Sequence, residues 1–507
     1  MQNNVAAYLE QTAKRYGEKT AITDGEKSVT FSKLLHDSKV LASALISRVK
    51  QKAPVIICME KSVEYVEAML ACAQIGAVYV PLDRAIPEMR FRYIQETLSA
   101  QVVLTRREDA VSFDVGSDAR LLYVEDLLEY EIDEEKLAQR RERILITDAL
   151  YMIFTSGSTG RPKGIVTTHL ALISFVDEMA DTFSFASEDS LANQVPFYFD
   201  ASTKDIYLMC KCGCTMHIIP KKLFMLPKNL MQFLNEKRIT RIIWAPSLLC
   251  MIANFKAFEK LRPEYLRTVF FVGEQMPTKQ MNAWRNCLPD VQYVNLYGSS
   301  EVTGSSAYYI IQRPMENTET IPIGIPFRHM DLFLLDQEDS LIEETETIGE
   351  ICVRGLSLSQ GYFDDEERTQ RVFVQNPLSP HFRDTIYRSG DLGRYNAFHE
   401  LVFVCRKDYQ IKRMGQRVEL GEIEAAISAI DGIQRICCLF NEKTQDILAV
   451  YEGTASPETM REGLTSVLPA YMLPSKYECV ERIPLNMNGK MDRELLKKRY
   501  FEGEKET

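Results

Sequence analysis

The chain has 507 residues, of which 46% are hydrophobic and 26% are charged, and its formal net charge is −11. A chain of this length is too long for one compact core, so we expect two or more domains. The acidic balance argues against a nucleic-acid-binding surface. Met1 to Val5 lack the basic start of a signal peptide, and no apolar run approaches the roughly 20 residues that span a bilayer. We therefore expect a cytoplasmic enzyme without membrane insertion and without a nucleic-acid partner.

The first part of the chain alternates strand-like and helix-like patterns. Short continuous apolar runs predict buried strands at 55–59, 77–83 and 101–105. The spacing of apolar residues predicts helices after 29–34, across 63–73 and over 87–96, and Gly76 is expected to end the second of these. Strands that alternate with helices in this way predict a mainly parallel sheet covered by helices.

A glycine- and hydroxyl-rich loop at 155–164 follows the apolar run 150–154. Glycine lets successive backbone N–H groups point at one spot, hydroxyls donate further hydrogen bonds, and Lys163 adds a positive charge. The Walker pattern is excluded because Pro162 precedes this lysine where that pattern requires glycine. The segment predicts a phosphate-binding loop of another kind, with an ordinary flexible turn as the alternative.

Twelve cysteines in a chain that shows no secretion signal indicate reduced thiols. Cys210, Cys212 and Cys214, with His217 nearby, could suggest a metal site, but a zinc knuckle usually has two residues between its cysteines. The segment leads into the apolar run 215–219, so we expect these residues to be structural.

Five further segments form an ordered series with the loop at 155–164, namely 76–83, 294–303, 387–393, 403–424 and 484–492. Together they resemble the AMP-forming adenylating enzymes, which include amino-acid adenylation domains of peptide synthetases, D-alanine:carrier-protein ligases, acyl-CoA synthetases and luciferases. The resemblance covers essentially the whole chain. It implies an α/β fold of the acetyl-CoA synthetase/luciferase type, with a large N-terminal domain of helix-covered sheets at 1–407 and a small mobile α+β domain at 408–507.

The resemblance implies that residues 294–303 contribute to a site for ATP and Mg²⁺. Asn295 would meet the adenine edge, Tyr297 would stack on the base, and Ser300 would contact phosphate. Glu301 would supply a hard oxygen for Mg²⁺. Without the family, these residues would be a Tyr-Gly turn with a surface glutamate.

The resemblance places the rest of the nucleotide site on distant segments. Asp391 would accept both ribose hydroxyls, Arg406 would contact the ribose, and Lys490 would reach the reacting carboxylate and the α-phosphate. An Asn-Gly pair precedes this lysine, so a lysine displayed on a hairpin tip is the alternative. The catalytic residues would be Lys490, Glu301 and Thr155. The remaining nucleotide-binding residues would be Thr155, Ser156, Gly157, Ser158, Thr159, Gly160, Lys163, Gly273 and Gly298.

Asp200 is the residue that distinguishes the branches of this family. It stands among aromatic residues, where a carboxylate is costly to bury without a cation. In amino-acid-activating members the aspartate at this place holds the α-ammonium of the substrate, and acyl-CoA synthetases usually lack it. A helix N-cap is the alternative role. The substrate pocket implied by the resemblance comprises Asp200, Ala201, Lys204, Ile243, Phe270, Val272, Leu296, Gly304 and Ser305.

Two features of this pocket point to different substrates. Lys204 in an otherwise apolar pocket favours an anionic side chain such as glutamate or aspartate. An ammonium that extends to solvent or pairs with a protein carboxylate is the alternative. Phe270, Val272 and Leu296 reduce the volume of the pocket, and residues 271–274 are similar to the D-alanine:carrier-protein ligase branch, which favours a small substrate.

The resemblance implies ATP-dependent activation of an amino acid to an aminoacyl-adenylate, with release of pyrophosphate. The product would pass to the phosphopantetheine thiol of a separate carrier protein, after the small domain turns about Asp408 and brings Gly415 near the path of the thiol. Cys405 stands where the family usually has glycine, which leaves the backbone geometry near the hinge open. Without the family, 403–424 is a β-hairpin followed by a helix. An acyl- or aryl-CoA ligase, or a non-catalytic nucleotide-binding protein on the same fold, remain alternatives.

Overall fold

The computed structural model describes residues 4–109, 115–116, 119–157, 161–408, 410–484 and 491–502. The chain separates into two compact units. Unit 1 comprises Met1–Arg84, Thr97–Ile153 and Gly164–Lys407, and unit 2 comprises Ala85–Glu96, Phe154–Lys163 and Asp408–Thr507. The domain boundary between residues 407 and 408 that the sequence suggested stays a prediction.

A six-stranded sheet with the order β6-β5-β3-β4-β7-β8 includes the strands expected near the start of the chain. The pairs β3–β4, β3–β5, β5–β6 and β4–β7 are parallel, as predicted. The bounds are β3 (Pro54–Met59), β4 (Val78–Asp83), β5 (Val102–Thr105), β6 (Arg120–Tyr123), β7 (Ala149–Thr155) and β8 (Lys163–Thr168).

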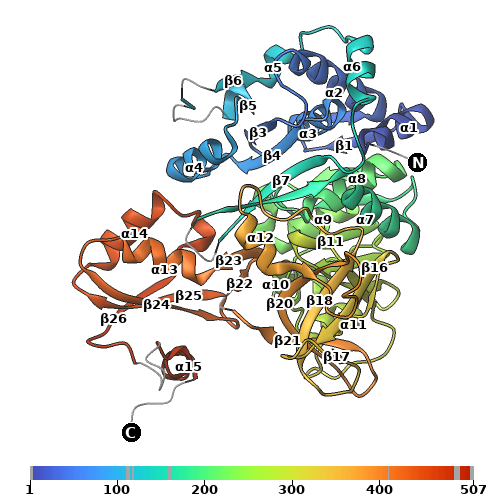
Figure 1. The fold of residues 1–507 in the computed structure, drawn as a ribbon. Coiled ribbons are helices and arrows are strands. Elements are labelled where there is room, and N and C mark those ends of the chain that lie inside the picture. Colours follow the sequence, from blue (N-terminus) through green and yellow to red (C-terminus); the bar gives the residue numbers. More distant parts are fainter. Residues whose placement is uncertain are drawn as a thin grey trace. The chain divides into compact units, whose positions relative to one another are not determined.

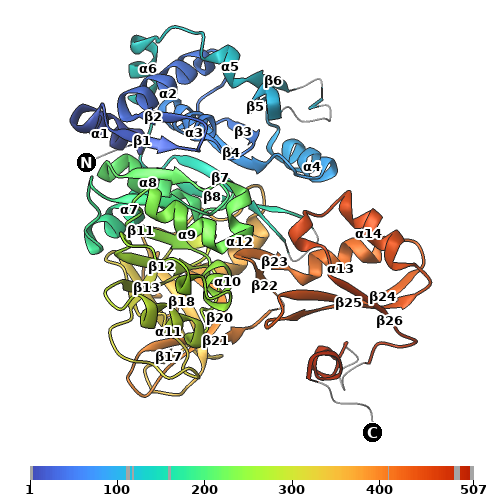
Figure 2. The ribbon, with the colours of Figure 1, turned by 180° about the vertical axis from the view of Figure 1, so that it is seen from behind.

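One helix of this part of the chain, α3 (Val63–Ile75), shows clear signals at both of its ends. The Ser62 hydroxyl accepts a hydrogen bond from the Tyr65 amide, and Gly76 ends the helix at φ 64°. Figure 2 shows α2 and α3 beside the strands. The other helices up to residue 141 are α1 (Ala6–Tyr16), α2 (Phe31–Ile46), α4 (Glu88–Leu98), α5 (Val124–Leu127) and α6 (Glu134–Arg141).

A nine-stranded sheet has the order β15-β14-β13-β12-β11-β9-β10-β1-β2. Its central strands are parallel, and antiparallel pairs close both edges. The strands are β1 (Thr20–Thr23), β2 (Ser28–Thr30), β9 (Ser190–Asn193), β10 (Thr215–Ile218), β11 (Arg241–Trp244), β12 (Thr268–Val272), β13 (Gln292–Tyr297), β14 (Ala307–Ile310) and β15 (Ile325–Pro326).

Side chains alternate between the two faces of this sheet because successive residues of a strand point in opposite directions. Phe270 and Leu296 belong to a core that includes residues of α7 and α8, whereas Trp244 and Phe271 belong to a second core with α9, α10 and α11. These helices are α7 (His169–Thr182), α8 (Ser202–Cys212), α9 (Pro227–Glu236), α10 (Pro246–Asn254) and α11 (Thr278–Cys287).

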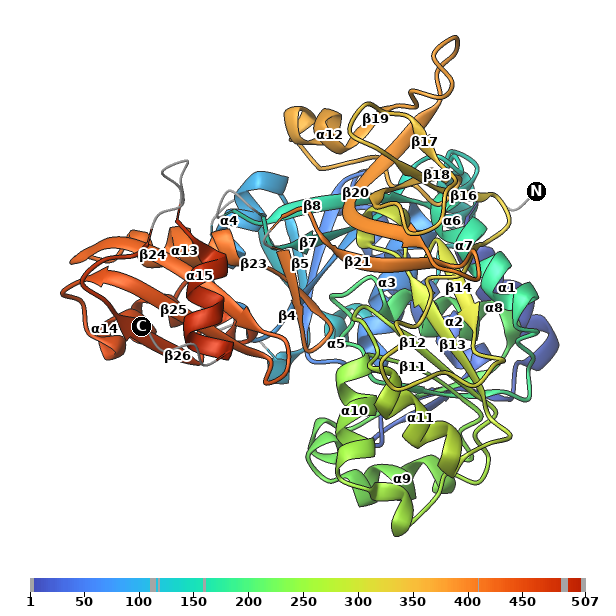
Figure 3. The same ribbon diagram turned by 90° about the horizontal axis from the view of Figure 1, so that it is seen from below.

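An antiparallel sheet with the order β17-β16-β18-β20-β19, to which β21 is added beside β20, completes unit 1. Figure 3 shows the long strand β20 beside β21, and their register places Asp391 opposite Arg406. The elements are β16 (Met330–Leu335), β17 (Leu341–Ile342), β18 (Gly349–Gly355), α12 (Glu366–Val372), β19 (Phe373–Gln375), β20 (Thr385–Tyr395) and β21 (Leu401–Arg406).

The C-terminal part of unit 2 is an α+β structure that begins with a hairpin and a helix, as predicted from 403–424. Helices α13 and α14 cover one face of a three-stranded sheet and α15 lies at the other face (Figures 1 and 2). The elements are β22 (Gln410–Arg413), β23 (Gln416–Glu419), α13 (Leu420–Ser428), β24 (Ile433–Asn441), β25 (Asp446–Gly453), α14 (Pro457–Thr465), β26 (Lys476–Cys479) and α15 (Arg493–Lys497).

No helix in the described parts of the chain is both long enough and apolar enough to cross a bilayer. The cysteine-rich segment 210–214 belongs to the end of α8 and the turn after it, and Cys210 and Cys214 are buried. Within the described ranges, no three or more His, Cys, Asp or Glu side chains are grouped to hold a metal ion. The burial of Cys210 and Cys214 is what the structural interpretation of these residues expects.

Candidate active site

Four of the predicted pocket residues lie on one face of the nine-stranded sheet. Ile243 of β11 pairs with Phe270 of β12, and Val272 of β12 pairs with Leu296 of β13. All four are buried in the same core. The alternation along neighbouring parallel strands brings residues more than 50 positions apart into one surface. The structure therefore brings these four together, as the sequence suggested.

Aromatic rings that no motif indicated pack around this surface. Phe183 lies edge-on to Phe270 with ring centroids 4.8 Å apart, and Phe185 stacks on Phe270 at 5.8 Å. Phe327 lies edge-on to Phe175 of α7 at 6.1 Å. Only the apolar spacing of 169–182 could have suggested that this helix covers the sheet, and nothing local identifies the ring contacts. The rings therefore fill space beside the residues that were predicted to form the substrate pocket.

Lys204 lies in α8 with 0% of its surface exposed. The alternative in which its ammonium extends to solvent is therefore wrong. Its Nζ lies 5.5 Å from the centroid of the Phe175 ring, a cation–π distance. A Cβ at Gly304 would lie 3.3 Å from this Nζ and 3.0 Å from the Phe175 ring. Gly304, at φ +82°, therefore leaves room for the ammonium, and Ser305 beside it is also buried.

A buried polar network adjoins Lys204. The Asp205 carboxylate accepts a 2.6 Å hydrogen bond from the Asn193 amide, and burial raises the pKa of Asp205 to about 7. Lys61 donates to the backbone carbonyls of residues 193, 194 and 195 at 3.0, 3.2 and 3.3 Å, and burial lowers the pKa of Lys61 to about 7. Both Lys61 and Lys204 favour the charged form of Asp205. The charges of two lysines thus act on one buried carboxylate, which the sequence did not indicate.

Asp200 lies in the turn before α8 and does not cap that helix. The N-cap position is Ala201, and no side chain makes a capping hydrogen bond. Only the backbone carbonyl of Asp200 is engaged in this turn, by the Thr203 amide at 3.0 Å and the Thr203 hydroxyl at 2.6 Å. The capping alternative is therefore wrong. Burial, and after it the charge of Asp200, raises the pKa of Tyr151 above its usual range.

Two residues predicted to bind the nucleotide, Tyr297 and Arg406, contact the carboxylate of a third, Asp391. Tyr297 at the end of β13 donates a 2.6 Å hydrogen bond to Oδ2 of Asp391, and Arg406 donates one of 2.6 Å to Oδ1. Burial, with the nearby Asp391 charge, raises the pKa of Tyr297 well above its usual range. The Asn295 amide nitrogen donates to the Pro322 carbonyl at 2.7 Å, which fixes the orientation of the amide. The hydroxyl, guanidinium and amide are thus held in place before a ligand binds.

Glu301 lies in a short 3-10 turn, Ser300–Val302, and is fully buried. Tyr362 donates a 2.8 Å hydrogen bond to Oε1 of Glu301, a contact that the sequence did not suggest. Mg²⁺ usually takes one or two protein carboxylates, and water and substrate phosphates complete its shell. The single buried carboxylate of Glu301 fits this pattern. One carboxylate would not be enough to hold a cation that is bound by protein ligands alone. Gly298 packs tightly nearby, since a Cβ there would lie 2.6 Å from the Ser305 Cα.

The first residues of the predicted phosphate loop, 155–157, belong to unit 2. Thr155 ends β7, and its buried hydroxyl has no hydrogen-bond partner in the described chain. The Ser156 hydroxyl donates to the Arg417 carbonyl at 3.0 Å and accepts from the Glu419 amide at 3.2 Å. The Gly157 amide donates to Glu422 at 3.0 Å. The predicted residues Ser158, Thr159, Gly160 and Lys490 lie outside the described residues.

The family model described as AMP-binding enzyme matches residues 9–363. The chain belongs to the AMP-binding enzyme family. The family prediction from the sequence motifs is therefore confirmed.

This AMP-binding enzyme is 28% identical over 495 residues to tyrocidine synthase 1 of Brevibacillus parabrevis, covering 96% of this chain and 44% of that protein. It therefore spans less than half the length of that curated relative. The solved structure of holo-PA1221, an NRPS protein containing adenylation and PCP domains, matches at a TM-score of 0.84 and 25% identity over 98% of this chain and 84% of that chain. The solved structure of a double mutant of the o-succinylbenzoate CoA synthetase MenE of Bacillus subtilis matches at a TM-score of 0.85 and 20% identity, covering 98% of this chain and 99% of that chain. At this identity the match shows the fold alone. The predicted fold class is confirmed.

The segment of this AMP-binding enzyme that was predicted to precede a hinge has ordinary backbone geometry at Cys405. That residue lies in β21 opposite Leu392, and it is not among the residues with a left-handed backbone. A glycine is therefore not required there. Asp408 accepts a 3.2 Å hydrogen bond from the Gln410 amide, and Gly415 has φ 80° in the turn of the β22–β23 hairpin. The hinge role of Asp408 stays a prediction.

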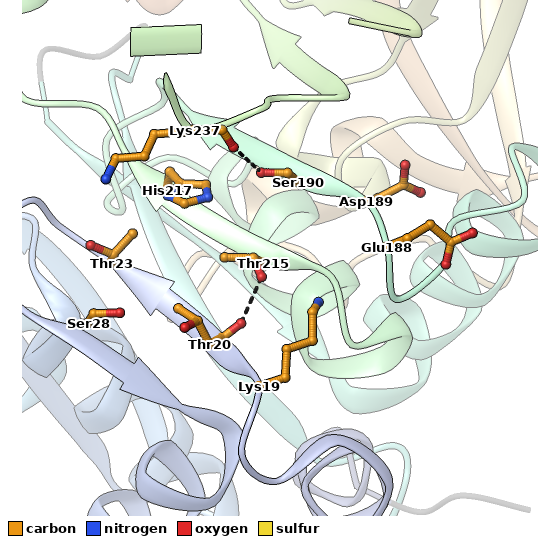
Figure 4. Close-up of a pocket in the computed structure, with 10 residues that line it drawn as sticks. All are labelled: Lys19, Thr20, Thr23, Ser28, Glu188, Asp189, Ser190, Thr215, His217 and Lys237. Atoms are coloured by element: carbon orange, nitrogen blue, oxygen red, sulfur yellow. Dashed lines mark hydrogen bonds between the residues drawn. The ribbon is translucent and has the colours of Figure 1, made fainter. Parts of the chain in front are cut away.

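A polar hollow of about 360 Å³ lies elsewhere in unit 1 of the AMP-binding enzyme. Figure 4 shows that hydroxyl and histidine side chains of β1, β2, β9 and β10 line it, together with Lys19, Glu188, Asp189 and Lys237 from the adjoining loops. Burial lowers the pKa of His217, one of the lining residues, to about 4. None of the predicted nucleotide or substrate residues lines this hollow, so it is separate from the candidate active site.

Proposed function

We propose that this chain uses ATP to activate the carboxylate of an amino acid and then passes the aminoacyl group to the phosphopantetheine thiol of a carrier protein. The observation that carries the proposal is the position of Asp200. Its carboxylate precedes the helix that carries Lys204, is half-buried, and is not used as a helix cap. A carboxylate placed in this way is suited to pair with the α-ammonium of an amino acid.

The reaction joins two anions and therefore depends on fixed positive groups and donors. A substrate carboxylate oxygen attacks the α-phosphorus of ATP, an acyl–phosphate anhydride bond forms, and the bond to pyrophosphate breaks. Tyr297, Asp391 and Arg406 would orient the nucleoside, and Lys490 would approach the α-phosphate and the carboxylate. Glu301 would hold Mg²⁺, which supplies charge neutralisation on the phosphates when bound. Such electrostatic positioning accounts for most of phosphoryl-transfer catalysis.

We infer that the substrate has a short side chain with an anionic group, such as that of aspartate or glutamate. Lys61, Lys204 and Asp205 together carry one net positive charge when all are ionised, and Lys204 lies against Gly304. A carboxylate on the substrate would offset this charge in a dry setting. The rings of Phe270 and Phe183 limit the length of the side chain. The same rings support a small residue such as D-alanine as the second candidate.

The proposal for the carrier rests on the relatives. The PA1221 protein contains adenylation and PCP domains, and tyrocidine synthase 1 is a synthase of which this chain matches one segment. An acyl- or aryl-CoA ligase would use the same ATP site but would have no use for Asp200. A non-catalytic binding protein would be expected to lack Glu301, Asp391 or Lys490, and all three are present.

The test is Mg²⁺- and ATP-dependent release of pyrophosphate, with hydroxylamine to trap the adenylate. The panel contains L- and D-amino acids and matched carboxylic acids that lack the amine, for example aspartate beside succinate and D-alanine beside propionate. We expect activity only with amino acids, and highest with aspartate or glutamate. Equal turnover of succinate and aspartate would contradict the role of Asp200, and activity confined to D-alanine would replace the acidic substrate with the small one.

Carrier transfer needs its own measurement. Candidate carrier proteins are prepared with and without phosphopantetheine and incubated with the enzyme, ATP and the best amino acid from the panel. We expect thioester only on the phosphopantetheinylated form, detected by intact-protein mass spectrometry. Thioester formation on free coenzyme A and not on any carrier would identify a CoA ligase instead.

A further inference from the structure

Glu422 lies where a phosphate oxygen would be expected, at the amide of the predicted phosphate loop. Its Oε2 accepts a 3.0 Å hydrogen bond from the Gly157 N–H. Its Oε1 lies 2.5 Å from the Arg90 Nη1. The side chains of Arg90 and Glu422 are 6% and 2% exposed. Gly157, Arg90 and Glu422 all belong to unit 2, although 265 residues separate the glycine from the glutamate.

The neighbouring loop residue is held by the same short segment of chain. The Ser156 hydroxyl is bound between the Arg417 carbonyl and the Glu419 amide, at 3.0 and 3.2 Å. Both of these backbone groups belong to β23, which leads directly into α13 with Glu422. A hydroxyl and an amide that the sequence assigned to phosphate are thus both engaged by residues 417–422.

A carboxylate and a phosphate oxygen compete for one N–H group because each is an anion that accepts a charge-assisted hydrogen bond. A buried carboxylate without a counter-charge would be strongly unfavourable, and Arg90 supplies that charge. The pair is therefore stable at the loop without a nucleotide. Phosphate can take the Gly157 amide only after Glu422 has left it.

We propose that Glu422, positioned by Arg90, acts as an internal competitor for pyrophosphate at Ser156 and Gly157. The proposal rests on the proposed function, in which pyrophosphate is a product. Binding of Glu422 to the loop after adenylation would expel pyrophosphate and prevent its return, so that the adenylate persists until the thiol attacks. Arg90 and Glu422 are positioning residues, because neither needs to touch the substrate. No bond is made or broken in this step, which exchanges one anion for another.

The first measurement is direct binding of inorganic pyrophosphate with Mg²⁺ by titration calorimetry, which requires no knowledge of the amino acid. We expect Glu422→Gln to bind pyrophosphate about tenfold more tightly than the unaltered chain, because the charged competitor is gone. The matched controls are Glu88→Gln and Arg92→Ala, which change an exposed ion pair on α4, the helix that carries Arg90. We expect both controls to bind pyrophosphate like the unaltered chain.

The second variant guards against a folding defect. Arg90→Gln with Glu422→Gln removes both charges of the pair, so it leaves no unpaired buried charge. This double variant is also expected to bind pyrophosphate about tenfold more tightly. Thermal unfolding of each variant establishes that it is folded before the titration. A folded double variant with unchanged or weaker pyrophosphate binding would overturn the proposal.

The kinetic readout separates competition from a merely structural role. In the amino-acid assay, Glu422→Gln should reach the same inhibition at an about tenfold lower concentration of added pyrophosphate. Without added pyrophosphate, its rate of adenylate formation should fall by less than about threefold. A structural defect would weaken pyrophosphate binding and adenylation together, which would overturn the proposal. Absence of any substrate-dependent pyrophosphate release in the unaltered chain would instead contradict the proposed function, while the calorimetric comparison would still test the competitor.

Discussion

The phenol of Tyr297 donates a 2.6 Å hydrogen bond to Oδ2 of Asp391, and these residues come from β13 and β20 of two different sheets. Arg406 donates to the other oxygen at 2.6 Å. The carboxylate is thus held between a neutral donor and a cation. Its orientation is therefore fixed by the packing of the two sheets, which under the proposed function would prepare it to bind the ribose hydroxyls.

We predict that Tyr297→Phe raises the KM for ATP about tenfold with a smaller change in kcat, because one donor to Asp391 is lost and the carboxylate can rotate. Steady-state kinetics with varied ATP measures the effect. Tyr309→Phe is the matched control, since Tyr309 donates a 2.7 Å hydrogen bond to Glu400 in the same unit. An equal rise of KM in both variants would contradict a specific role for the Tyr297 hydroxyl.

Replacement of Lys204 should change which amino acid is activated. Lys204→Met keeps the approximate volume and removes the charge, so we expect kcat/KM for aspartate or glutamate to fall by roughly 10²-fold relative to that for alanine. Lys211→Met is the control, because Lys211 lies on the same helix but pairs with Asp177. An unchanged ratio of acidic to neutral substrates in Lys204→Met would show that the ammonium does not select the substrate.

Glu301→Gln should abolish most of the Mg²⁺-dependent activity while leaving the fold intact. The amide oxygen can still accept the Tyr362 hydrogen bond, so the buried site stays satisfied, but the ligand charge is lost. We expect adenylation to fall by about 10²–10³, as when one preorganised charge-stabilising group is removed. A Mg²⁺ titration of the rate measures the change, and an unchanged Mg²⁺ requirement would mean that the cation is held elsewhere.

The stability of the enzyme should decrease in mild acid through His169. Burial lowers the pKa of His169 from 6.5 to about 4, so the unfolded chain binds more protons between these values. The free energy of unfolding therefore falls as pH drops from 6.5 towards 4, by on the order of 3 kcal/mol for this group. Chemical denaturation at pH 7 and pH 4.5 measures the difference, which His169→Asn should reduce. The exposed His381→Asn is the control, and an equal reduction in both would contradict the assignment.

We predict that Asp408→Pro separates the two half-reactions. Proline fixes its own φ and restricts the preceding Lys407, so a backbone rotation at this position is blocked. Adenylate formation should stay within about threefold, while transfer to a phosphopantetheinyl carrier should become undetectable, since such conformational steps gate many enzymes. Hydroxylamine trapping measures the first step and carrier mass spectrometry the second. Loss of both steps, or of neither, would exclude a hinge at Asp408.

The local features of this protein follow from residues close together in the sequence. Ser62 and Gly76 delimit α3 because a side-chain oxygen and a left-handed glycine satisfy the free ends of the helix. The order of the motifs indicates the family, and the alternation of apolar runs with helical patterns predicts the parallel strands. Each of these depends on interactions within a few residues or on a recognisable series along the chain, so the sequence by itself determined them.

Other features were decided only by tertiary structure. The rings of Phe183 and Phe185 meet Phe270 because a helix, a turn and a sheet strand fold onto one another. The full burial of Lys204 and the approach of Glu422 to Gly157 depend on chain segments that are far apart in sequence. The spacing of residues along a helix or strand predicts which face of that element a side chain occupies. It does not predict which group from a distant part of the chain will contact that face. The residues predicted for the ATP site were therefore named from the sequence, whereas the charges around the predicted pocket and the contacts of the predicted phosphate loop were set by packing.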